Sequence, residues 1–184
     1  RDADANGVPG LWITPEGSPT DRVVLYLHGG GYVVQSAKTH LKLASHIAVQ
    51  ANSRVLSIDY RLAPEHPHPA AVTDSLTAYR HLLESGFLPE RIAISGDSAG
   101  GGLTVATLVA ARDAGLPQPS VGVALSPWVD LEGTGQSMDS NAEKDFMVGR
   151  GALSIMADLF IASGSKRDPL AAPLYADRKS TRLN

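Results

Sequence analysis

The sequence predicts an α/β fold in which helices cover both faces of a mainly parallel β-sheet. Short apolar runs of strand length alternate with longer segments whose apolar residues recur at helical spacing. Two glycine-rich turns, at residues 28–32 and 96–101, each come directly after one of the short runs. The 184 residues, of which 43% are hydrophobic and 19% charged, suffice for one domain with its own core.

Three strands and a helix are predicted in the first third of the chain. Residues 11–13 form a short apolar run between two proline-containing loops, which favours an edge strand. Residues 22–27 form a longer apolar run, typical of a parallel strand covered on both faces. Apolar residues recur at helical spacing across 39–52, and residues 54–58 are predicted to form the next strand.

A loop and a second helix are predicted next. Residues 59–67 contain two prolines, which block regular structure. An ion pair between Arg61 and Glu65 is expected to hold this loop in shape. A helix is then predicted to start at Pro69 and to end before Gly86, with one apolar stripe between them.

The second half of the chain continues the alternation. Residues 91–95 have the length and β-branched content of a buried strand, and residues 103–114 are predicted to form a helix that ends before Gly115. Residues 121–125 are predicted to be another buried strand. A last helix is predicted at 151–163, after an irregular, glycine-rich stretch.

A serine between two glycines lies where a predicted strand becomes a helix. The turn Gly96-Asp97-Ser98-Ala99-Gly100 has the pattern of a nucleophile elbow. Such a turn is so tight that the residues two before and two after the serine must lack side chains. The hydroxyl then stands clear of the sheet, and the helix N-terminus directs amide donors at the reacting centre. We predict Ser98 as a nucleophile; the alternative is a serine that only caps the helix.

The second glycine turn is His28-Gly29-Gly30-Gly31-Tyr32. Three glycines leave their backbone amides unobstructed, so a carbonyl oxygen could accept hydrogen bonds from them. A phosphate-binding loop is a weaker interpretation because the turn lacks a subsequent Gly-Lys-Ser/Thr, and a flexible turn is a third. Since open α/β sheets place their sites at the carboxyl ends of strands, we expect both glycine turns to meet in one oxyanion pocket.

The composition excludes several classes of partner and site. The net charge is −3 without a long basic run, so neither nucleic acid nor an anionic membrane is an expected partner. The chain has no cysteine, and its apolar stretches are far shorter than the about 18 residues of a membrane span. No cofactor and no metal are expected, and nothing in the sequence specifies an oligomeric state. The chain opens on Arg1 rather than Met, so we expect N-terminal residues to be missing, and we expect a cytoplasmic location.

Four motifs stand in the order and spacing of one known family. The sequence resembles the bacterial hormone-sensitive-lipase-like carboxylesterases, which are α/β hydrolases, from about Leu25 to Tyr175. The resemblance implies hydrolysis of small-molecule carboxylic esters with short or medium acyl chains, through an acyl-enzyme on Ser98. The motifs that carry it are residues 28–31, 59–65, 96–101 and 126–130. The implied oxyanion donors are the amides of Gly29, Gly30 and Ala99, and the supporting motif residues are His28, Gly31, Gly96, Asp97 and Gly100.

The sequence departs from this family after Ser98. The catalytic order in this fold is serine, then an acid, then histidine, but all six histidines precede Ser98. We therefore expect the triad Asp or Glu, the triad His, the last strands and an N-terminal cap to lie outside this chain. Residues 177–184 match the translation of a common sequencing adapter, so we predict one partial domain at 1–176 and a non-native tail. Such a chain should expose an unpaired sheet edge, aggregate and hydrolyse esters weakly.

Two other functions remain open. One is a non-catalytic small-molecule binding protein of the same fold that has kept the serine, and the other is an amidase or peptidase. Several apolar residues after Ser98 could line an acyl pocket or belong to the core. They are Trp128, Met138, Phe146, Met147 and Phe160.

Overall fold

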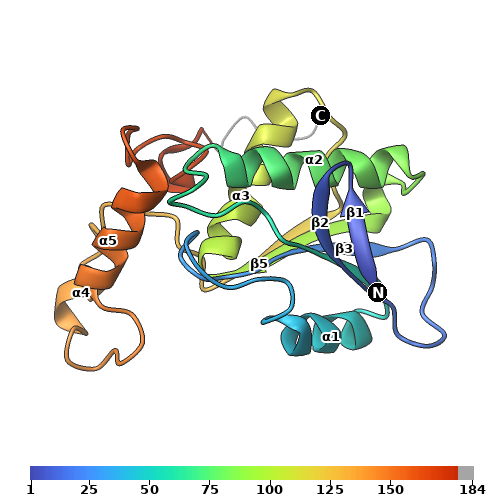
Figure 1. Ribbon diagram of the computed structural model, residues 1–184, viewed down its shortest axis with the longest axis horizontal. Coiled ribbons are helices and arrows are strands. Elements are labelled where there is room, and N and C mark those ends of the chain that lie inside the picture. The colour runs from blue at the N-terminus through green and yellow to red at the C-terminus, as the bar shows by residue number, and fades with distance from the viewer. Residues whose placement is uncertain (178–184) are drawn as a thin grey trace.

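A computed structural model describes residues 1–177; the predicted tail, apart from Asp177, lies outside the described residues. Six strands form one mixed sheet in the order β1-β2-β4-β3-β5-β6 (Figure 1). Their bounds are β1 Asp2–Ala5, β2 Val8–Ile13, β3 Val23–Leu27, β4 Arg54–Ile58, β5 Ile92–Asp97 and β6 Val121–Leu125. Strands β4, β3, β5 and β6 are parallel, whereas β1 and β2 are antiparallel to their neighbours. The predicted, mainly parallel sheet is confirmed.

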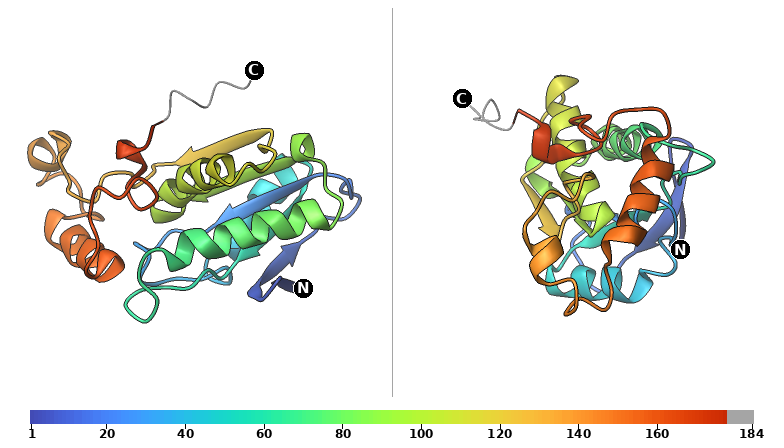
Figure 2. Two further views of the ribbon diagram at one scale, coloured as in Figure 1. Left: turned by 90° about the horizontal axis from the view of Figure 1, so that it is seen from above. Right: turned by 90° about the vertical axis from the view of Figure 1, so that its left-hand side faces the viewer.

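Helices cover both faces of this sheet, as predicted. Figure 1 shows α2 and α3 on one face and α1 on the other, while α4 and α5 lie beyond the end of the sheet (Figure 2). The bounds are α1 Leu41–Gln50, α2 Ala70–Glu84, α3 Ala99–Asp113, α4 Ser137–Ser140 and α5 Arg150–Ile161. Two 3-10 turns, η1 Pro89–Arg91 and η2 Pro173–Tyr175, complete the elements.

Strand β3 lies in the centre of the sheet and is buried along its whole length. Leu25 and Leu27 join the large core cluster with residues of α2 and α3. Val24 and Tyr26, which alternate with them, join a smaller cluster with residues of α1. Because successive side chains of a strand point to opposite faces, a strand covered on both sides needs a continuous apolar run.

The N-terminal edge of the sheet differs from the prediction. The strand predicted at 11–13 is longer and lies inside the sheet, between β1 and β4, and the edge strand is β1. Strand β1 has no apolar run, since it alternates Asp and Ala. Asn6 and Gly7 connect the two strands with positive φ angles of 55° and 89°. An Asn-Gly pair is a strong hairpin signal, and it could have located β1 from the sequence.

Strand β6 also differs from the prediction, because it is not buried. It is the outermost described strand on its side of the sheet and pairs only with β5. Val121, Val123 and Leu125 are 48%, 43% and 38% exposed. The apolar run correctly located a strand, but burial depends on the neighbours that the strand has.

The loop after β4 is held by a different ion pair from the one predicted. Arg61, expected to pair with Glu65, instead contacts Asp74 of α2. The guanidinium Nη2 lies 2.7 Å from Oδ1 of Asp74, and the backbone N–H of Arg61 donates to Oδ2 at 2.8 Å. This buried carboxylate ties the loop to α2, so the pair is set by tertiary packing rather than by closeness in the sequence.

Candidate active site

Ser98 occupies a strained turn between β5 and α3. Its φ and ψ angles are 53° and −117°, outside the regions that a serine ordinarily adopts. The backbone around it is fixed, because its N–H donates to the carbonyl of Leu125 at 2.9 Å and its carbonyl accepts from the N–H of Trp128 at 2.8 Å. The residue is nevertheless exposed. Strain of this kind persists only where the surrounding structure enforces it, and it leaves the hydroxyl accessible.

The two glycines that flank Ser98 have no room for a side chain. A Cβ atom on Gly96 would lie 2.3 Å from the carbonyl oxygen of Gly100. A Cβ atom on Gly100 would lie 2.0 Å from the carbonyl oxygen of Leu27. The predicted crowding within the elbow is therefore present, and β3 adds to it from the neighbouring position in the sheet.

The glycine loop after β3 lies beside this elbow. Strands β3 and β5 are adjacent and parallel, with Leu27 opposite Gly96, so the segments after them share one edge of the sheet. Gly30, Gly31 and Tyr32 have positive φ angles of 116°, 63° and 64°. A Cβ atom on Gly31 would lie 2.2 Å from Sδ of Met156 in α5. Two distant glycine motifs thus meet at one place, as the sequence predicted.

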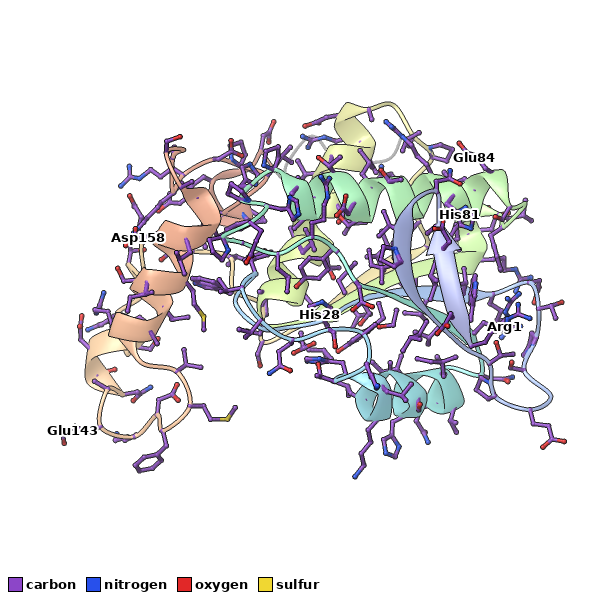
Figure 3. All side chains as sticks on the ribbon, in the orientation of Figure 1. Arg1, His28, His81, Glu84, Glu143 and Asp158 are labelled. Atoms are coloured by element: carbon purple, nitrogen blue, oxygen red, sulfur yellow. The ribbon has the colours of Figure 1, made fainter. Side chains whose placement is uncertain are left out.

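His28 supports this loop from within the core. It comes directly after β3 (Figure 3) and is only 1% exposed. Its ring stacks on that of Tyr60 at 4.3 Å, and the hydroxyl of Tyr60 donates to the carbonyl of His28 at 2.6 Å. Burial lowers the pKa of His28, so the buried ring favours its neutral form. These contacts give His28 a structural place in the loop.

The three predicted oxyanion donors do not share one environment. The N–H of Gly29 donates to Oδ1 of Asp97 at 3.0 Å, so this amide has a different partner from the one predicted. Within residues 1–177, the amides of Gly30 and Ala99 donate to no protein acceptor. Ala99 is the first residue of α3, where backbone amides have no partner within the helix. Of the three predicted oxyanion donors, Gly30 and Ala99 therefore keep an amide without an acceptor among residues 1–177.

A family profile described as the alpha/beta hydrolase fold matches residues 24–184. The chain belongs to the α/β-hydrolase family. An acetyl-hydrolase from Streptomyces hygroscopicus is 43% identical over 166 residues, which are 90% of this chain and 55% of that protein. An esterase from Acinetobacter venetianus is 33% identical over 172 residues, which are 93% of this chain and 56% of that protein.

A solved esterase structure is also similar to this α/β hydrolase. The crystal structure of an esterase from the bacterial hormone-sensitive lipase family has a TM-score of 0.94 and 52% sequence identity. The match covers 96% of this chain and 59% of that one. The predicted resemblance to this family is confirmed. The chain spans somewhat more than half the length of the relatives that it matches.

The histidines of this α/β hydrolase, which all lie among the described residues, make no hydrogen bond to the predicted nucleophile, Ser98. Among residues 1–177, no imidazole hydrogen-bonds to the hydroxyl of Ser98. His40 and His68 lie in turns and are partly buried. Nε2 of His40 lies 3.4 Å from Asp97, and Nε2 of His68 lies 3.4 Å from Asp168. The described residues therefore hold Ser98 and the predicted oxyanion donors without a base in contact with the serine.

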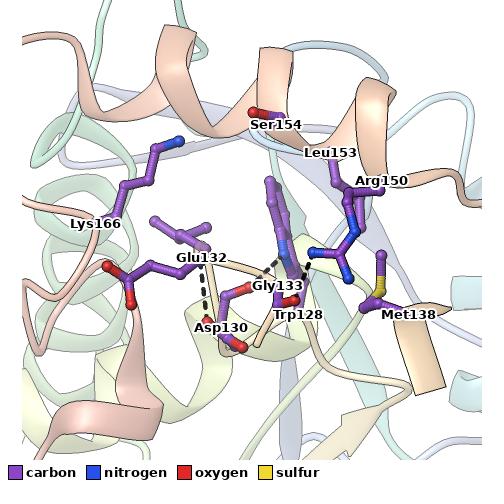
Figure 4. A pocket seen from close by; sticks show the side chains of 10 residues that line it. Trp128, Asp130, Glu132, Gly133, Met138, Arg150, Leu153, Ser154 and Lys166 are labelled. Atoms are coloured by element: carbon purple, nitrogen blue, oxygen red, sulfur yellow. Dashed lines mark hydrogen bonds between the residues drawn. The ribbon is translucent and has the colours of Figure 1, made fainter. Parts of the chain in front are cut away.

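A cavity of about 260 Å³ lies between α5 and the segment after β6 (Figure 4). Of the five residues predicted for an acyl pocket, Trp128 and Met138 line it. Phe160 belongs to the core, where its ring stacks on Tyr32 at 3.8 Å. Phe146 and Met147 are 95% and 93% exposed and lie outside this cavity. Trp128, which lines the cavity, donates its backbone N–H to the carbonyl of Ser98. The cavity therefore lies beside the elbow.

Among residues 1–177, no helix is both long and apolar enough to cross a bilayer.

Proposed function

We propose that the protein hydrolyses carboxylic esters through an acyl-enzyme on Ser98. The observation that carries the proposal is the strained, exposed Ser98 at the N-terminus of α3, beside a glycine loop with an available amide. The elbow alone would fit a helix cap. The free amides of Gly30 and Ala99 beside it favour a site for acyl transfer.

In this mechanism, Oγ of Ser98 attacks the ester carbonyl carbon while its proton passes to a general base. The π electrons of the carbonyl move to its oxygen, which then accepts hydrogen bonds from the amides of Gly30 and Ala99. Removal of one such donor costs about 3–4 kcal/mol of transition-state stabilisation. The tetrahedral intermediate expels the alcohol, which takes the proton, and water then releases the acid from Ser98. None of the described contacts of Ser98 is a general base. We propose that the complete protein supplies one.

The proposed substrates are small-molecule esters with short or medium acyl chains. One relative is named an acetyl-hydrolase and another an esterase, which supports a short acyl group. The cavity beside Trp128 has a mixed lining of apolar side chains and paired charges, among them Arg150 and Lys166. A pocket of this kind suits a small, partly polar ester better than a long acyl chain.

A paired substrate assay tests this proposal. Purified chain is given p-nitrophenyl acetate, p-nitrophenyl butyrate and the p-nitroanilide of acetate, together with Ser98→Ala. Ser126→Ala is the matched control, since Ser126 also comes directly after a strand, is exposed and has a positive φ of 45°. Without a base in contact with Ser98 we expect slow ester hydrolysis, of which Ser98→Ala removes the part that passes through the acyl-enzyme and Ser126→Ala removes none.

The other outcomes separate the alternatives. Hydrolysis of the anilide at the rate of the ester would favour an amidase or peptidase. Ester hydrolysis that is unchanged in Ser98→Ala would overturn the proposed role of the serine. Saturable ester binding by a folded chain without any Ser98-dependent turnover would favour the non-catalytic binding protein.

A further inference from the structure

Asp97 directly precedes Ser98, and its carboxylate binds groups from three other segments. Oδ1 accepts hydrogen bonds from the hydroxyl of Tyr26 at 2.6 Å and from the N–H of Gly29 at 3.0 Å. Oδ2 lies 3.4 Å from Nε2 of His40, at the start of α1. One side chain at the end of β5 therefore connects the elbow to β3, to the glycine loop and to α1.

We propose that Asp97 is a positioning residue that holds the glycine loop, residues 28–31, at the distance from Ser98 that oxyanion binding requires. This inference rests on the proposed function of Ser98. Asp97 itself touches no reacting atom. Its effect on the reaction is transmitted through Gly29 to the next amide, that of Gly30.

The identity of Gly29 supports this assignment. Its φ angle is not positive, unlike those of Gly30 and Gly31, so backbone conformation does not require a glycine there. A Cβ atom on Gly29 would lie 2.3 Å from Oδ2 of Asp97 and 3.1 Å from its Cγ. The carboxylate occupies the space where a side chain would be. Gly29 is thus fitted to Asp97, as Gly96 and Gly100 are fitted to the elbow.

The conformation of the loop gives this contact its importance. Residues 30–32 all have positive φ angles. The two glycines adopt such angles without steric cost, but Tyr32 does so only where other contacts enforce it. On the core side, the hydroxyl of Tyr60 holds the carbonyl of His28. On the side of the elbow, the carboxylate of Asp97 holds the amide of Gly29. Among residues 1–177, this second contact is the hydrogen bond that joins the loop to the elbow.

Tyr26 keeps the carboxylate in place. Its side chain lies in the cluster between the sheet and α1. Burial, and then the hydrogen bond to Asp97, raise the pKa of Tyr26, so its hydroxyl stays protonated and remains a donor. Tyr26 of β3 therefore holds the Asp97 carboxylate in the orientation in which it accepts the N–H of Gly29, as a positioning residue requires.

Asp59 offers a matched control within the same chain. It comes directly after the neighbouring parallel strand β4, and its Oδ1 accepts the N–H of Ala37 at 2.7 Å. Asp59→Ala removes a comparable carboxylate–amide bond. It does so without touching the bond between Asp97 and Gly29.

The test measures backbone amide exchange by NMR in the full chain, and the rate at which a fluorophosphonate labels Ser98. Asp97→Ala should speed exchange at Gly29 by about tenfold, because it removes a charged hydrogen bond, whereas Asp59→Ala should not. Labelling of Ser98 should fall by about tenfold or more in Asp97→Ala, since small displacements of a site are costly. Asp97→Asn keeps an acceptor oxygen, so it should recover part of the slow exchange at Gly29 and part of the labelling rate of Ser98.

Two results would overturn the proposal. One is the same Gly29 exchange in Asp97→Ala as in Asp59→Ala. The other is an unchanged labelling rate in a variant whose Gly29 amide exchanges fast. If Asp97→Ala does not fold, the comparison of Asp97→Asn with Asp59→Asn decides in the same way. If the unmodified chain is not labelled at Ser98, the proposed function fails, while exchange at Gly29 still decides whether Asp97 holds the loop.

Discussion

Strands β3 and β6 are both apolar runs of five residues, and they have opposite environments. Strand β3 is buried at every position, whereas no residue of β6 is fully buried. Strand β3 lies between β4 and β5 and has helices on both faces, but β6 has a described neighbour only at β5. An apolar run therefore predicts that a strand forms, whereas the place of that strand in the sheet decides whether its side chains are buried.

The candidate site depends on the central position of β3 in the sheet. The glycine loop comes after β3, and the elbow comes after β5, its neighbour, so each is held by the other. The segment after β6 contacts the elbow from the other side, where the N–H of Trp128 donates to the carbonyl of Ser98. Contacts at the centre should therefore contribute more to stability than those at β6, a difference that paired substitutions in the two strands can measure.

The largest difference is expected between two glycines. Gly100→Ala would bring a Cβ atom to 2.0 Å from the backbone oxygen of Leu27, which cannot move without distorting β3. We expect a loss of more than about 4 kcal/mol, or failure to fold. In Gly122→Ala of β6, the close contact is with the flexible end of the Leu108 side chain, at 2.6 Å, so this variant should cost far less. Urea denaturation of both variants measures this, and equal losses would contradict the crowding inferred for the elbow.

A smaller difference is expected between two aliphatic side chains. Leu25→Ala empties a fully buried position in β3 and should cost about 3 kcal/mol. Val123→Ala in β6 removes a side chain that is 43% exposed and should cost less than about 1 kcal/mol. The free energies of unfolding from chemical denaturation measure both. A loss for Val123→Ala as large as that for Leu25→Ala would mean that β6 is covered in solution.

Part of the pH dependence of stability near neutral pH should come from His28, at the end of β3. Burial lowers the pKa of His28, so between that value and the ordinary one near 6.5 the unfolded chain binds more protons than the folded chain. The stabilisation by neutral His28 is full above pH 6.5 and is lost as the pH falls below it. Thermal unfolding from pH 7.5 to 5 should show a falling Tm, and His28→Gln should flatten this slope. His46→Gln, at an exposed position, should leave the slope as it was; a slope that His28→Gln does not change would assign it to other groups.

The smallest effect on folding, with a clear effect on association, is expected from a charge on β6. Val123→Lys places an ammonium group on an exposed edge strand and should change the free energy of unfolding by less than about 0.5 kcal/mol. A charged edge resists pairing with another chain, so concentration-dependent light scattering should fall. The same substitution at Val24 of β3 should instead destabilise the fold. Unchanged scattering in Val123→Lys would contradict the prediction that the β6 edge drives aggregation.

The sequence predicted the features that depend on local chemistry. The order of strands and helices, the tight turn around Ser98 and the approach of the two glycine motifs can all be inferred from turn residues and apolar runs. It did not predict contacts that depend on which strands become neighbours. Arg61 pairs with Asp74, and the amide of Gly29 binds Asp97, because the folded chain brings these groups together. The exposed side chains of β6 were missed for the same reason, whereas the Asn6-Gly7 hairpin was present in the sequence as a signal.

The central claim is that Ser98 is a nucleophile poised beside available oxyanion donors. Its most direct test is to treat the folded chain with a fluorophosphonate and to locate the adduct by peptide mass spectrometry. We predict one adduct per chain, on Ser98, which forms slowly because no described base contacts the hydroxyl, is absent in Ser98→Ala and is retained in Ser126→Ala. An adduct on another residue, or none on a chain whose NMR spectrum shows it folded, would contradict the claim.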